Sequence, residues 1–171
     1  MTDLEDLYRE IILDHYRSPR NRGELESPPA HRVEGFNPLC GDEVVVTMLV
    51  EDGRVADIKF AGSGCSISQS SASLMSSAVK GKPLDEVREL IFTFKSMMSI
   101  HQASLGSNST DGEDADDSYN GNGDGNGLAD VRKLGELAAL QGVVKFPVRI
   151  KCATLSWNAL AQGLDEIDAG R

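Results

Sequence analysis

Apolar residues near the start of the chain recur at helical spacing. In residues 3–17 they fall three or four positions apart, for example at Leu4, Leu7 and Ile11, which is the period of an amphipathic α-helix. Prolines and a glycine in residues 18–30 are typical of a turn or loop. We therefore predict a first helix that ends near Arg17.

The next apolar pattern is that of β-strands. Residues 43–62 contain two runs rich in β-branched residues, separated by Asp52 and Gly53. An Asp-Gly pair between two such runs is a strong signal for a β-hairpin. We therefore predict an antiparallel hairpin over these residues.

Helical patterns follow the hairpin. One helix is expected from near Cys65 to Gly81, a second from Pro83, and a third over residues 128–142. A short extended piece then carries Cys152 into a final helix. The predicted fold class is α+β, with a small antiparallel sheet of about three strands covered on one face by about five helices.

Residues 103–127 have almost no apolar content and are rich in Gly, Asn, Ser and Asp. Such a stretch buries too little surface to offset the entropy of ordering it. We expect a flexible acidic insertion within a single domain that spans residues 1–171. Part of it resembles a calcium loop, but the final ligand position holds Val131 instead of glutamate, so we expect no calcium there.

Charge and composition narrow the class of protein. The net charge of −10 includes seven acidic residues between His101 and Asp130, a stretch without Lys or Arg, so the rest of the chain carries only −3. No basic stripe for nucleic acid is present, and no secretory signal pattern or membrane-spanning apolar run is found. We therefore expect a cytoplasmic protein that binds neither nucleic acid nor membrane.

The three cysteines do not have the spacing of a disulfide framework, so they are buried fillers, metal ligands or nucleophiles. Cys40 precedes the hairpin and Cys65 follows it, so the two should be neighbours. Asp42 can point to the same place through the turn. Together with Cys152, expected at a helix start, these residues could form a tetrahedral zinc site. Because no CxxC pair is present, the spacing alone makes a metal or catalytic site and ordinary buried cysteines about equally probable.

Four stretches of the chain resemble the U-type proteins of iron–sulfur cluster assembly. They read LYREIILDHYRSPRNRG, NPLCGDEVVV, FAGSGCSISQSSASLM and FPVRIKCATLSWNAL, and they cover nearly all of the chain outside the insertion. The sequence is more similar to the SufU branch than to the IscU scaffold branch. Its second block has the SufU form GSGCSISQSS, a segment is added between the second and third cysteines, and Lys151 stands where the scaffold branch carries a histidine.

The resemblance implies a zinc ion bound by Cys40, Asp42, Cys65 and Cys152. It also implies a sulfurtransferase that acts with a PLP-dependent cysteine desulfurase of the SufS type. The resemblance further implies that one zinc ligand exchanges when the partner docks, so that Cys40 is freed to attack the persulfide sulfur, which then passes to a downstream iron–sulfur scaffold. We expect such a protein to be a monomer or a weak dimer.

Arg149 lies shortly before Cys152, in the segment expected to be extended, and we expect the two side chains to face the same side. We assign it a catalytic role in steadying Asp42 or the charge of the transferred sulfur, with an ordinary surface arginine as the alternative. Lys151 is a poor metal ligand because its amine is protonated near neutral pH, which weakens the scaffold interpretation.

Three other functions compete with sulfur transfer. The first is a scaffold that binds an iron–sulfur cluster in place of zinc, and the second is a purely structural zinc site. The third is a zinc hydrolase or deaminase, which needs an open coordination position and a general base, and the deaminase signature is absent. Among the histidines, we expect His15 to be a packed core residue and His31 and His101 to be solvated.

Overall fold

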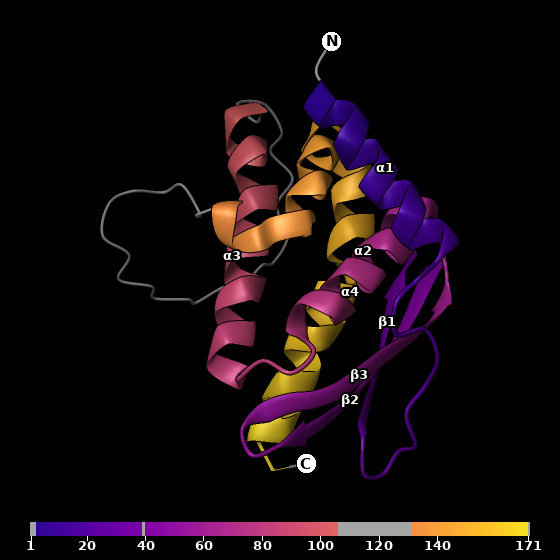
Figure 1. Cartoon of the computed structure of the whole chain (residues 1–171), viewed down its shortest axis with the longest axis vertical. Coiled ribbons are helices and arrows are strands. Elements are labelled where there is room, and N and C mark those ends of the chain that lie inside the picture. Colours follow the sequence, from indigo (N-terminus) through magenta and orange to yellow (C-terminus); the bar gives the residue numbers. More distant parts are fainter. Residues whose placement is uncertain (1–2, 39, 106–130, 171) are drawn as a thin grey trace.

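The computed structural model describes residues 3–38, 40–105 and 131–170, apart from some side chains near the ends of these ranges. Figure 1 shows its helices gathered along one side of a small sheet. The elements in chain order are α1 (Asp3–Arg17), β1 (His31–Asn37), β2 (Asp42–Glu51), β3 (Arg54–Ser63), α2 (Ser66–Val79), α3 (Leu84–Leu105), the 3-10 helix η1 (Val131–Lys145) and α4 (Pro147–Asp168).

The three strands form one antiparallel sheet in the order β1-β2-β3. The predicted hairpin is β2 and β3, and its turn residues Asp52 and Gly53 have φ of 53° and 72°, as a tight two-residue hairpin turn requires. β1 pairs with β2 so that Asn37 faces Asp42 across the ladder. The start of the predicted hairpin therefore pairs with a third strand, β1, at the end of the sheet where the first cysteine lies.

The helices bury the apolar face of the sheet. α4 packs on β1 and β2, while α2 packs on β3 and on α4. Met48 and Phe60 of the sheet and Trp157 and Leu160 of α4 are fully buried, and the rings of Trp157 and Phe94 stack with centroids 4.3 Å apart. The predicted fold class is confirmed, and the core fixes the position of α4 beside the start of β2.

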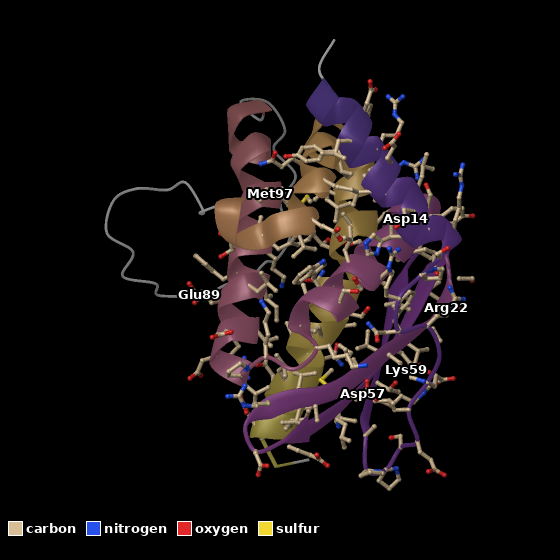
Figure 2. The ribbon with its side chains drawn as sticks, in the orientation of Figure 1. Asp14, Arg22, Asp57, Lys59, Glu89 and Met97 are labelled. Carbon is tan, nitrogen blue, oxygen red and sulfur yellow. The ribbon has the colours of Figure 1, made fainter. Side chains whose placement is uncertain are left out.

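The chain between α1 and β1 is fastened to the sheet by Arg22 (Figure 2). Its guanidinium lies 5.6 Å from the centroid of the Phe60 ring and donates to Gln69 at 2.7 Å and to the Gly62 carbonyl at 2.8 Å. One side chain thus ties this segment to β3 and to the first turns of α2.

Several local expectations are wrong. The segment before Cys152 is not extended, because α4 already begins at Pro147. The helix expected over residues 128–142 is a 3-10 helix over Val131–Lys145, interrupted at Gly135 by a φ of 57°.

The predicted acidic insertion is described only at its start. Residues 103–105 still belong to α3, and the remainder of residues 103–127, with nearly all of the calcium-like sequence, lies outside the described residues. Among the described helices, none is long and apolar enough to cross a membrane.

Candidate metal centre

Cys40 lies in the turn between β1 and β2. The turn is closed by a hydrogen bond of 2.9 Å from the Gly41 N–H to the Asn37 carbonyl, and Gly41 adopts a φ of 69° that glycine tolerates without strain. The Cys40 side chain is exposed. The turn therefore presents this thiol at the end of the sheet, where another molecule can reach it.

Asp42 is the first residue of β2 and is buried, with 2% of its surface exposed. Its Oδ1 accepts a hydrogen bond of 3.1 Å from the Cys65 backbone N–H, and its Oδ2 lies 3.7 Å from the Cys65 sulfur. None of the ion pairs among the described side chains involves this carboxylate. A buried carboxylate that is surrounded by thiols and lacks a basic partner suits a bound cation.

Cys65 is the N-cap residue of α2, and its sulfur accepts a hydrogen bond of 3.5 Å from the Ser68 N–H. The cap holds the Cys65 sulfur at the N-terminus of α2. Gly64 allows the backbone to approach Asp42, because a Cβ atom there would lie 2.3 Å from Ser68 Oγ and 2.9 Å from Asp42 Oδ1. The glycine before Cys65 is therefore part of the site.

Cys152 lies in the second turn of α4, not at a helix start, and it is fully buried. Its sulfur is 3.5 Å from the Cys40 sulfur and 3.9 Å from Asn37 Nδ2. Burial, followed by the hydrogen bond to Cys40, raises the pKa of Cys152. The Cys152 thiol donates a hydrogen bond toward the Cys40 sulfur.

These elements bring most of the predicted ligands together. One donor atom from each of Cys40, Asp42 and Cys152 lies within 4.8 Å of the other two. Cys65 is outside this group but touches it through Asp42. Two sulfurs and one carboxylate oxygen, with a third sulfur beside them, are a donor set that fits a tetrahedral zinc ion.

Arg149 lies in the first turn of α4 and is exposed. The segment is helical and not extended, and a helix places residues three positions apart, such as Arg149 and Cys152, on one face. The charge of the Cys65 sulfur, followed by that of Cys152, raises the pKa of Arg149. The guanidinium is therefore close enough to the sulfurs to interact electrostatically with negative charge on them.

The described histidines lie away from the donor group. His15 is buried, and its ring nitrogens contact Ser73 Oγ at 2.7 Å and the Glu136 carboxylate at 3.2 Å, as expected for a packed core residue. His31 was expected to be solvated, but it is half-buried and contacts Glu166 at 2.6 Å. The side chain of His101 lies outside the described residues.

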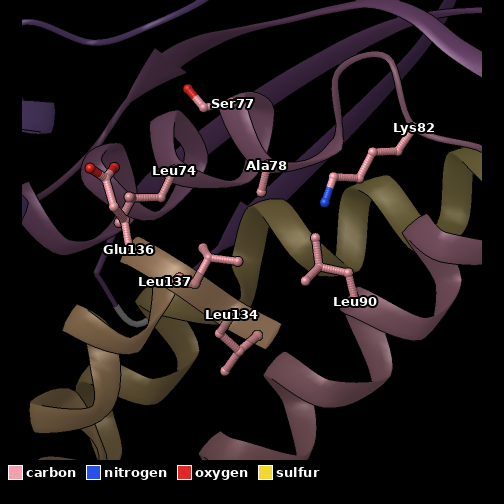
Figure 3. Close-up of a pocket in the computed structure, with 9 residues that line it drawn as sticks. Leu74, Ser77, Ala78, Lys82, Leu90, Leu134, Glu136 and Leu137 are labelled. Carbon is pink, nitrogen blue, oxygen red and sulfur yellow. The ribbon is translucent and has the colours of Figure 1, made fainter. Parts of the chain in front are cut away.

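Two hollows were not foreseen from the sequence. A cavity of about 310 Å³ lies between α2, α3 and η1 (Figure 3), and it is lined mainly by apolar side chains such as Leu74, Leu90 and Leu137. A groove of about 700 Å³ runs between α1, η1 and the start of α4, and Arg149 and Ser66 line it beside the cysteines. Of these two hollows, the groove borders the candidate metal centre, so it bears on the chemistry.

Comparisons with known proteins agree with this architecture. Residues 7–115 match the family model described as the NifU-like N terminal domain. The zinc-dependent sulfurtransferase SufU of Bacillus subtilis is 41% identical over 168 residues, which cover 98% of this chain and 96% of the relative. The iron–sulfur cluster assembly scaffold protein IscU of Streptococcus pyogenes is 34% identical over 164 residues, which cover 96% and 86%.

Solved structures show the same fold. A candidate iron–sulfur cluster assembly scaffold protein for the SUF system of Fervidobacterium islandicum superposes with a TM-score of 0.70 at 29% identity, over 91% of this chain and 94% of the other. The N-terminal part of a NifU-like protein from Brucella abortus superposes with a TM-score of 0.72 at 21% identity, over 99% and 100%. This chain therefore belongs to the NifU-like N-terminal domain family, among the iron–sulfur cluster assembly proteins that include SufU and IscU.

Proposed function

We propose that this chain is a zinc-dependent sulfurtransferase that accepts persulfide sulfur on Cys40 from a PLP-dependent cysteine desulfurase of the SufS type. The observation that carries the proposal is the exposed Cys40 thiol grouped with Asp42 and the buried Cys152 thiol. The 41% identity to a relative named as a zinc-dependent sulfurtransferase supports the same chemistry.

Zinc would be held by Cys40, Asp42 and Cys152, with Cys65 beside them as the fourth ligand. Bound zinc favours the thiolate form of its cysteine ligands, which is the form that reacts. The fold holds two of these ligands in place. Asp42 is fixed by the Cys65 N–H, and Cys152 is fixed in the packed helix α4.

The exposure of the three sulfurs selects Cys40 as the acceptor. Cys152 is fully buried and Cys65 caps α2, whereas Cys40 is exposed at a hairpin turn. Its Sγ attacks the outer sulfur of the partner's persulfide, and a new S–S bond forms on Cys40. The S–S bond on the partner breaks, and the partner's cysteine leaves as a thiolate that retains the electron pair.

Arg149 is proposed to assist this transfer. Its guanidinium is exposed beside the Cys65 and Cys152 sulfurs, so a persulfide on the neighbouring Cys40 would bring its negative charge close to a fixed cation. Arginine keeps its charge at every pH relevant here. The residue therefore stabilises the sulfur after it has moved and while it waits for a downstream iron–sulfur scaffold.

A reducing compartment suits the proposed chemistry. All three cysteines are free, and the transfer needs Cys40 as a thiolate. Since thiols stay reduced in the cytoplasm, we place the reaction there.

A cluster-building scaffold is the second candidate, because the S. pyogenes relative carries that description. In this chain Lys151 precedes Cys152 and is exposed on α4. A protonated amine cannot replace an imidazole as a ligand to iron. The donor group therefore favours sulfur transfer over cluster assembly.

The proposal is tested by measuring bound zinc and the turnover of a SufS-type desulfurase with L-cysteine, with and without a chelator. We expect stoichiometric zinc, a colourless protein, and a stimulation of turnover that disappears with the metal. Stimulation that persists after the metal is removed would show that the zinc is only structural. A brown protein that passes a cluster to an apo-protein after anaerobic reconstitution would favour the scaffold function.

A further inference from the structure

The sulfurs of Cys40 and Cys152 lie 3.5 Å apart, although 111 residues separate them in the sequence. This distance falls within the range at which reacting atoms are held in near-attack geometry, roughly 3–3.5 Å. Cys40 belongs to a hairpin turn and Cys152 to a packed helix. The proposed transfer uses Cys40 as the nucleophile and gives the Cys152 sulfur no reaction of its own.

The position of the contact decides which reaction is open to Cys152. When Cys40 carries a persulfide, its Sγ becomes the inner sulfur of the S–S bond. The Cys152 Sγ lies 3.5 Å from this inner sulfur atom. A thiolate that attacks the inner sulfur expels the outer sulfur. A thiolate that attacks the outer sulfur would instead take it over as a new persulfide.

We propose that Cys152 is a resolving thiol, which attacks the inner sulfur of the Cys40 persulfide and releases the outer sulfur as sulfide. The inference rests on the proposed function, because the persulfide on Cys40 is its starting point. The Cys152 Sγ–Cys40 Sγ bond forms and the bond between Cys40 Sγ and the outer sulfur breaks. The outer sulfur leaves with the electron pair as hydrosulfide, and the Cys152 thiol gives up its proton.

Electrons balance within this step. The sulfane sulfur is reduced to sulfide by two electrons, and the two cysteine sulfurs are oxidised to a disulfide. No external oxidant is needed. The cycle returns to its starting state when a dithiol reductant exchanges with the Cys40–Cys152 disulfide, and the exposed Cys40 sulfur is the one such a reductant can reach.

Cys65 is less suited to this role. Its sulfur is not part of the group of donor atoms within 4.8 Å that holds Cys40 and Cys152. It accepts the capping hydrogen bond from Ser68 and faces Asp42. A reaction at Cys65 would therefore give up an N-cap contact, whereas Cys152 already points its sulfur at Cys40.

The test charges the full chain with glutathione persulfide, which delivers sulfur to an exposed thiol without any desulfurase. Released sulfide is measured with time, and disulfides are mapped by mass spectrometry of unreduced peptides, on the chain as purified and after treatment with a chelator. We expect one sulfide ion to be released for each Cys40–Cys152 disulfide that forms, in the chain as purified, in the chelator-treated chain, or in both. A stable Cys40 persulfide in both preparations, or a disulfide that joins Cys40 to Cys65, would overturn the inference.

Two matched variants complete the test. In Cys152→Ser we expect sulfide release to fall about tenfold or more, because the neighbouring thiol is lost, whereas Lys151→Ala, at the exposed neighbour of Cys152 on α4, should still release sulfide. Equal release from Cys152→Ser and the unmodified chain would overturn the inference. If Cys152→Ser does not fold, the disulfide map of the unmodified chain still decides. Since no desulfurase is present, a failure here is distinct from a failure of Cys40 to accept sulfur from that enzyme.

Discussion

The carboxylate of Asp42 accepts a hydrogen bond of 3.1 Å from the backbone N–H of Cys65, which joins the first residue of β2 to the cap of α2. The contact brings the two ends of the predicted hairpin together in one site, because Asp42 begins β2 and Cys65 follows β3. It also orients the buried carboxylate toward the sulfurs.

Replacing Gly64 by alanine should weaken zinc binding without changing any ligand. The added Cβ would lie 2.9 Å from Asp42 Oδ1 and 2.3 Å from Ser68 Oγ, so the carboxylate must move away from the cluster. We expect a loss of about tenfold or more in zinc affinity, as for other contacts that orient ligands, measured by competition with a chelating dye. Gly142→Ala is the control, because its Cβ meets no atom within 4 Å, and equal affinities for the two variants would contradict the account.

The substitution Asp42→Asn removes the negative charge while the side chain keeps its size and its acceptor for the Cys65 N–H. We expect the metal-free chain to stay folded and zinc affinity to fall by roughly 10–100-fold. Thermal unfolding with and without zinc measures both effects. Asp165→Asn, at an exposed carboxylate that pairs with Arg88, should bind zinc normally, and a similar loss in this control would show that the effect at Asp42 is not specific.

Zinc binding should release protons. The pKa of Cys152 is raised in the metal-free chain, so its thiol is protonated at neutral pH, whereas zinc binds the thiolate. Affinity therefore rises with pH below that pKa, by about tenfold per pH unit for each proton released. Calorimetry in buffers of different ionisation enthalpy counts these protons, and an affinity that stays constant from about pH 6.5 to about pH 8 would contradict a buried protonated ligand.

Arg149→Ala should slow persulfide acceptance and leave zinc content unchanged. Because the guanidinium is exposed, solvent screens its interaction with the sulfurs, and the expected loss is roughly two- to fivefold. Arg149→Lys should recover part of the rate, since it keeps a positive charge but not the planar group. The neighbouring variant Lys151→Ala is the control in the same desulfurase assay, and an equal loss there would assign the effect to general surface charge.

The helix Asp3–Arg17 and the hairpin of β2 and β3 could be predicted because their periodicity is strong and their turn chemistry is specific. β1 was not located, since Gly35 interrupts its apolar pattern and Arg32 and Glu34 point outward. The start of α4 was misassigned as extended. Its Val-rich sequence suits a strand, but Pro147 at the first helical turn and the packing of Trp157 favour the helix.

About half of the candidate metal centre could be predicted from the sequence alone. The ends of a hairpin are close in any fold, so the approach of Asp42 and Cys65 was predictable. The contact between Cys40 and Cys152 depends on how α4 packs on β1 and β2, which no local pattern specifies. For the same reason the burial of Cys152 and its raised pKa were not foreseen.

The central claim is that Cys40 is the thiol that accepts the sulfur. The most direct measurement incubates the full chain with a SufS-type desulfurase and L-cysteine, blocks the thiols with an alkylating agent, and maps the added sulfur by peptide mass spectrometry. The account predicts either the extra sulfur as a persulfide on the peptide that carries Cys40 or, once that persulfide is resolved, a Cys40–Cys152 disulfide with the sulfur released as sulfide. Extra sulfur found only on Cys65 or Cys152, with Cys40 unmodified, would contradict it.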